Sequence, residues 1–165
     1  MKKAVWSGLF TAAAVLLFSA PTFAQATDTK SVTVTATVNA KAKLTLGSGT
    51  VTFGDEDPDV SSLLSAPALS VDVKSRTAAA GTVTLTVLAS GDFTSGSDTI
   101  AISALTWTAS GTSFVDGTMS TSAVSVGSWT GGGTQAGTQT YKLVNDWTYK
   151  TGTYSTSLTY TLTAP

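Results

Sequence analysis

The sequence predicts an all-β protein, an antiparallel β-sandwich of about 8–10 short strands. Three observations carry this prediction. Apolar residues alternate with threonine and serine over most of the chain after residue 26, which is the period of half-buried strands. Turns rich in Gly, Asp and Ser separate these runs, and no helical period is sustained. Many short strands with such turns between them are typical of a sandwich.

The clearest strand is expected where Val83, Leu85 and Val87 alternate with threonines. Shorter runs of the same kind predict further strands at 32–38, 44–46, 51–53, 69–73, 124–126, 141–143 and 154–162. No linker and no second composition regime interrupts them, so we expect residues 27–165 to form a single domain.

A change of phase occurs between residues 100 and 107. Ile100 and Ile102 share one parity, whereas Leu105 and Trp107 share the other. One extra residue in a strand reverses the faces of all that follow, so this slip predicts a β-bulge. Trp107, on the alternating run, is predicted to fill the core.

The N-terminus resembles a secretory signal peptide at residues 1–26. Lys2 and Lys3 precede an apolar run at 4–20, and small residues follow up to Ala26. This order of charge, apolar run and small residues is typical of a cleaved export signal. We therefore expect the protein in the periplasm, at the cell surface or outside the cell, with no membrane span in its mature form.

Composition excludes much chemistry. The chain has no His and no Cys, so Ser-His-Asp triads, Cys-His dyads, ordinary zinc sites and disulfides are ruled out. We expect no catalytic residues, no enzymatic activity and no cofactor apart from a weak calcium site. Of nine basic residues, Lys2 and Lys3 leave with the signal; seven then face ten acidic ones, a net charge of −3. Such a charge gives no attraction to nucleic acid.

The densest group of charges consists of Asp55, Glu56, Asp57 and Asp59. Four carboxylates in five residues suggest weak calcium binding through oxygen ligands. A solvated turn after a strand explains the same residues without a metal, and we favour it because the spacing matches no calcium motif.

Aromatic side chains suggest a second kind of site. Trp129, Trp147 and Tyr149 could stack against sugar rings if they were exposed. The alternative is that large aromatics pack in the core, and for Trp129 and Trp147 we favour packing because such residues dominate core burial.

The segment that follows the predicted signal has its own pattern. Val32, Val34, Ala36 and Val38 alternate with threonines, so residues 27–40 are expected to act as a strand. Two interpretations are open: the first strand of its own domain, or a strand that adds to an open sheet edge of another subunit.

Short motifs resemble two families. They are Leu44-Thr45-Leu46, Val51-Thr52-Phe53-Gly54, and Thr151-Gly152-Thr153-Tyr154 leading into Leu158-Thr159-Tyr160-Thr161-Leu162. Together they resemble spore-coat-U-like pilins of archaic chaperone–usher fimbriae and WxL surface domains. At the places of the two Trp-x-Leu motifs stand Val83-Thr84-Leu85 and Tyr160-Thr161-Leu162, without tryptophan, and the cysteines usual in those pilins are absent. The resemblance implies an immunoglobulin-like sandwich at the cell surface.

These observations predict an exported, non-enzymatic structural or adhesive protein. Its expected role is a pilus, fibre or matrix subunit that assembles by β-strand addition, with further copies or other surface proteins as partners. The alternative function is a monomeric surface module that binds cell-wall or other glycans through exposed aromatic side chains.

Overall fold

The computed structural model describes residues 26–165. The chain divides after Ala36 into an N-terminal unit and a folded unit, Thr37–Pro165. Apart from Ala26, the predicted signal peptide lies outside the described residues. No helix in the described part is long and apolar enough to cross a membrane.

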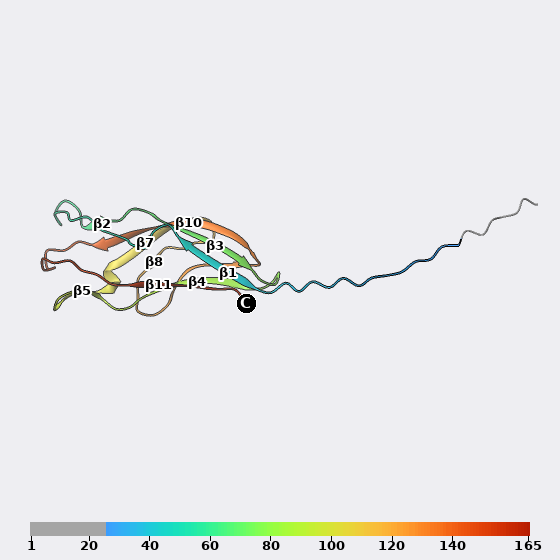
Figure 1. The fold of residues 1–165 in the computed structure, drawn as a ribbon. Coiled ribbons are helices and arrows are strands. Elements are labelled where there is room, and N and C mark those ends of the chain that lie inside the picture. The colour runs from blue at the N-terminus through green and yellow to red at the C-terminus, as the bar shows by residue number, and fades with distance from the viewer. Residues whose placement is uncertain (1–25) are drawn as a thin grey trace, which may run out of the picture. The chain divides into compact units, whose positions relative to one another are not determined.

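The folded unit is an all-β sandwich, as predicted, with two main antiparallel sheets packed together (Figure 1). The larger sheet has the order β1-β3-β10-β7-β8, with β2 also pairing β10. Its strands are β1 (Lys41–Leu46), β2 (Leu63–Ser65), β3 (Leu69–Arg76), β7 (Leu105–Ser110), β8 (Gly117–Thr118) and β10 (Gly133–Val144). The smaller sheet has the order β11-β4-β9, made of β4 (Thr82–Ala89), β9 (Val124–Thr130) and β11 (Leu158–Thr163). A hairpin of β5 (Phe93–Ser95) and β6 (Asp98–Ile100) completes the fold.

The core lies between the two sheets, and the alternation of the sequence produces it. On β4, Val83, Leu85 and Val87 are buried while the two threonines between them are half-buried. Val71 and Val73 of β3 are equally buried from the facing sheet. Because successive residues of a strand point to opposite faces, each sheet supplies one apolar face to the shared core.

The predicted β-bulge between Ile100 and Trp107 is wrong. The chain instead leaves β6, makes a single 3-10 turn, η1 (Ile102–Ala104), and enters β7. The turn shifts the alternation of buried and exposed residues by one position, so Ile102, Leu105 and Trp107 can all be buried. A register shift does occur elsewhere, between Leu85 and Thr86 where β4 pairs β9.

Two predicted strands do not form. Residues 51–53 carry no strand, although Val51 and Phe53 pack half-buried against the core. Residues 26–40 also form no strand, and all of them are exposed. The segment 27–40, called the N-terminal segment below, is thus not a first strand of its own sandwich in this structure.

Candidate functional site

The sandwich is closed along one side. There the residues after β7 cover the outer edge of β9, with a bridge between Phe114 and Gly127. The Val115 N–H donates to the Val126 carbonyl at 2.9 Å, which adds a second link across this side. The middle of the β9 edge is therefore covered by the chain itself.

The other side is open. Here β1 ends the larger sheet and β11 ends the smaller one, and within the described chain neither has a strand partner on its outer edge. Each edge therefore presents backbone N–H and carbonyl groups that a further strand could pair. The two edge strands approach each other at the end of the folded unit that holds the C-terminus and diverge toward its other end (Figure 1).

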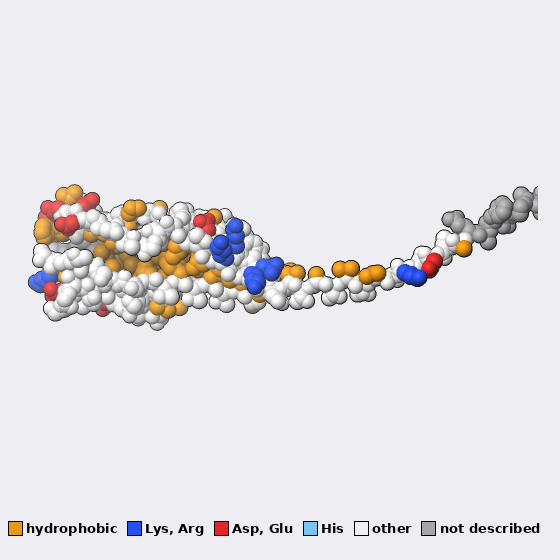
Figure 2. Space-filling view, in the orientation of Figure 1, with side chains coloured by type: hydrophobic (Ala, Val, Ile, Leu, Met, Phe, Trp, Pro, Cys, Tyr) orange, Lys and Arg blue, Asp and Glu red, His pale blue; other side chains and the backbone are white. Residues whose placement is uncertain are grey.

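Between these edges lies a cleft of about 1030 Å³, called the β1–β11 cleft below. Leu46 lines it from β1, and Leu158 and Tyr160 line it from β11; all three are half-buried. Its floor includes the buried side chains of Leu105 and Tyr141. Figure 2 shows hydrophobic side chains exposed along the middle of the folded unit, between its two layers. The core is thus open to solvent on this side.

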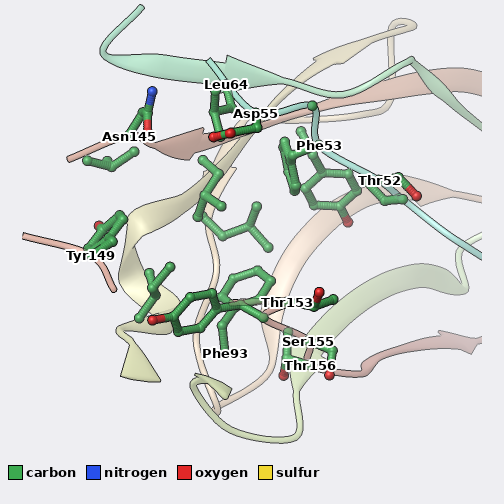
Figure 3. Close-up of a pocket in the computed structure, with 18 of the residues that line it drawn as sticks. Thr52, Phe53, Asp55, Leu64, Phe93, Asn145, Tyr149, Thr153, Ser155 and Thr156 are labelled. Carbon is green, nitrogen blue, oxygen red and sulfur yellow. The ribbon is translucent and has the colours of Figure 1, made fainter. Parts of the chain in front are cut away.

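One end of the cleft is walled by loops. In Figure 3, Phe53 and Leu64 lie on one side and Phe93 on the other, with Thr153 and Ser155 beside Phe93. Apolar rings thus line the interior, and hydroxyl groups lie beside them. Such a surface suits a strand with apolar side chains on one face and a hydrogen-bonding backbone.

A polar network lies beside the cleft. The Tyr160 hydroxyl donates to Gln139 Oε1 and also contacts the Tyr141 hydroxyl. Gln139 is fully buried, and its Nε2 has no hydrogen-bond partner within the described chain. Burial raises the pKa of Tyr160 well above its ordinary value, and the neighbouring Tyr141 raises it further. Burial also raises the pKa of Tyr141, against the lowering effect of its hydrogen bond with Tyr160.

These raised pKa values predict a loss of stability in alkali. A tyrosine ionises near pH 10 when unfolded, whereas folded Tyr160 and Tyr141 hold their protons to higher pH. Their contribution is complete below pH about 10 and falls above it, by at most about 1.4 kcal/mol per pH unit for each tyrosine. Urea unfolding at stepped pH should show this slope, and Tyr160→Phe should reduce it. An unchanged slope in Tyr160→Phe would contradict the assignment.

The predicted strand residues lie in the N-terminal segment. Val32, Val34 and Val38 are 86%, 88% and 68% exposed, and Ala36 is exposed as well. No described strand pairs with them. They form an alternating apolar row that has no strand partner among residues 26–165.

The predicted glycan-stacking residues do not form one surface. Trp129 pairs with Val83 at the beginning of β4, near the C-terminal end of β11. It packs half-buried on the core, with its ring 6.5 Å from that of Phe114. Trp147 lies beyond the C-terminal end of β10, at the other end of the sandwich, and is 67% exposed.

Tyr149 is the third of these residues. It is half-buried against the core and lines the β1–β11 cleft. Of the three predicted residues, Trp147 alone is exposed.

The acidic group forms a turn. The carboxylate of Asp57 accepts from the Asp59 N–H at 2.9 Å, and that of Asp59 accepts from Trp147 Nε1 at 3.1 Å. Asp55 and Glu56 are exposed. Among residues 26–165, no group of three or more His, Cys, Asp or Glu side chains is arranged to hold a metal ion. The calcium hypothesis therefore gains no support from this arrangement.

The sequence did not single out the cleft itself. Its lining comes from segments far apart in the chain, among them the residues after β1 and those before β11. The alternation of Leu158, Tyr160 and Leu162 with threonines could be recognised in the sequence. The position of their strand at the edge of a sheet could not. Comparison with known proteins adds no further lead: the chain matches no protein-family model and no curated protein.

Proposed function

We propose that the protein is an exported, non-enzymatic structural subunit that assembles by β-strand addition. The N-terminal segment of one copy inserts into the β1–β11 cleft of the next copy. The observation that carries this proposal is the open side of the sandwich, where two unpaired edge strands flank an exposed part of the core.

The side chains of the N-terminal segment fit this cleft. Val32, Val34, Ala36 and Val38 recur with the period of a strand, so all four would point to one face. In the free subunit they lie in water, and insertion would bury them against Leu46, Leu158 and similar residues. Burying a valine contributes on the order of 1.5 kcal/mol or more.

The backbone supplies the rest of the binding energy. An inserted strand would pair with the free edge of β11, and with β1 where the cleft is narrow enough. The alternating stretch 32–38 has seven residues and the edge of β11 has six, of which Leu158 and Tyr160 line the cleft, so the inserted strand would continue beyond the cleft along the rest of that edge. The absence of His and Cys from the chain fits a role without catalysis.

Deletion of residues 27–40 tests the proposal. The full chain, recovered after export, is expected to form concentration-dependent, SDS-resistant assemblies, visible as fibres in the electron microscope. The deletion variant should stay monomeric because the inserting strand is gone. A synthetic peptide of residues 27–40 should bind the variant and raise its thermal midpoint, since a ligand of the folded state alone stabilises it.

The alternative function, glycan binding, rests on the exposed ring of Trp147. A full chain that is monomeric at every concentration, and whose fluorescence a polysaccharide quenches unless Trp147 is replaced, would displace strand addition in favour of this alternative. Assembly that persists without residues 27–40 would show that a different surface joins the subunits.

A further inference from the structure

The two ends of the folded unit can be told apart by register. Lys41, the first residue of β1, pairs with Arg76 at the end of β3. The Thr77 hydroxyl donates to the carbonyl of Pro165, so the C-terminus lies at this same end. Hence β1 begins where β11 finishes, and the two edge strands run antiparallel to each other across the cleft.

This first end carries an unusual group of cations. Lys43 stands directly opposite Lys74, and Lys41 directly opposite Arg76, all four exposed. Like charges placed opposite each other on paired strands are destabilising. The only ion pair of the described chain joins Lys30 and Asp28, so none of the four is ion-paired. Asp72, two residues before Lys74 on the same face of β3, offsets one of the four charges and leaves the group cationic. We call these residues the cationic end (Figure 2).

The opposite end is acidic. It consists of the loops that follow β1 and β10, which carry one basic residue, Lys150, and five acidic ones, Asp55, Glu56, Asp57, Asp59 and Asp146. The two loops are fixed together, because Asn145 Nδ2 donates to the carbonyls of Glu56 and Ser61 at 2.9 Å each. We call these five residues the acidic end; Figure 2 shows acidic side chains gathered far from the cationic end.

A strand can insert into the cleft in two directions. The direction decides which end of the acceptor copy meets the cationic end of the donor copy. Lys41 directly follows the N-terminal segment, so the cationic end of the donor copy must lie where its inserted strand leaves the cleft. Insertion antiparallel to β11 makes the strand leave at the acidic end of the acceptor. Insertion parallel to β11 makes it leave at the cationic end, where cations would face cations.

From this charge complementarity we infer that the N-terminal segment inserts antiparallel to β11, and that assembly docks the cationic end of each copy on the acidic end of the next. The inference rests on the proposed strand addition. It adds the direction of the inserted strand and a second contact, which joins the cationic end of one copy to the acidic end of the next. The resulting interface is heterologous, so it repeats head to tail and yields an open fibre. Opposite charges at such an interface chiefly accelerate association and select the orientation.

Charge reversal tests the second contact. One variant carries Lys43→Glu with Lys74→Glu, and another carries Asp55→Lys with Glu56→Lys. At low ionic strength each should assemble about tenfold or more slowly than the parent, and salt should reduce the parent's rate. The chain with all four substitutions has the parent's net charge and should recover most of the rate. If it stays slow, or if neither reversal slows assembly, the contact between the two ends is refuted.

Cross-linking tests the direction against a clean background, because the chain contains no cysteine. A donor with Asn39→Cys is mixed with an acceptor carrying either Thr153→Cys, which lines the cleft at its acidic end, or Thr163→Cys, at the end of β11. Oxidation should join the donor to the first acceptor and not to the second. Joining to the second alone would overturn the inferred direction and leave strand addition intact. If the donor is joined to neither acceptor and the parent chain does not assemble, both the strand addition and its inferred direction are refuted.

Discussion

Val34→Arg is expected to abolish assembly, whereas Thr35→Arg, one residue away, should leave most of it. Val34 belongs to the apolar row of the N-terminal segment and would enter the β1–β11 cleft on insertion. Burying an unpaired guanidinium there costs several kcal/mol. Thr35 would point to the opposite face, into solvent, because strand side chains alternate. Sedimentation and SDS-resistant band patterns of the two variants, compared at equal concentration, measure the difference.

The pair is well controlled because both side chains are exposed in the free subunit. Val34 is 88% exposed in the free subunit and lies in the N-terminal unit of the chain. Both variants should therefore unfold at the same urea concentration as monomers, which separates a defect of assembly from a defect of folding. Equal assembly by the two variants would contradict insertion of the valine face, and loss in Thr35→Arg alone would show that the opposite face is buried.

Local patterns identified most of the strands because one face of each is buried. Residues 83–87 alternate as predicted and lie in β4, whereas the strand predicted over 154–162 begins only at Leu158, the first residue of β11. The β-bulge prediction was wrong because two different structures can produce the same change in the alternation of buried residues. Between Ile100 and Leu105 the chain uses a 3-10 turn rather than a bulge, and apolar parity alone does not distinguish an extra residue within a strand from a break between two strands.

The candidate site was predictable only in part, for a different reason. The alternation of residues 32–38 was apparent, and so was the choice between an internal first strand and an added one. The β1–β11 cleft was not, because it depends on which strands occupy the sheet edges. That is a property of long-range pairing: Leu46 of β1 and Leu158 of β11 are more than a hundred positions apart in the sequence yet line one cavity. The opposed pair Lys43 and Lys74 likewise follows from register and not from local sequence.

Trp107→Ala should cause the largest loss of stability, about 3–5 kcal/mol. Trp107 is 1% exposed, its Nε1 donates to the Val115 carbonyl at 2.9 Å, and its ring lies 6.2 Å from that of Tyr141. The substitution leaves a cavity, breaks this aromatic contact and orphans a carbonyl. Neighbouring side chains cannot readily fill the space, since the partner of Trp107 on β8 is Gly117, which has no side chain, and its partner on β10 is Tyr141, which is already fully buried. Urea unfolding of the variant lacking residues 27–40, followed by circular dichroism, measures the loss without interference from assembly.

Trp147→Ala is the matched control, because it removes the same side chain from a site that is 67% exposed. It should change stability by no more than about 0.5 kcal/mol, since it loses only the exposed hydrogen bond to Asp59. A typical domain is stable by about 5–15 kcal/mol, and the chain has no disulfide to supplement its core. Trp107→Ala would therefore remove a large share of the free energy of unfolding. The sandwich is open between β1 and β11, so its stability depends on the side chains buried elsewhere between the two sheets. If the two variants unfolded at the same urea concentration, the core around Trp107 would not be the source of that stability, and a packed sandwich with one open side would be the wrong description of the free subunit.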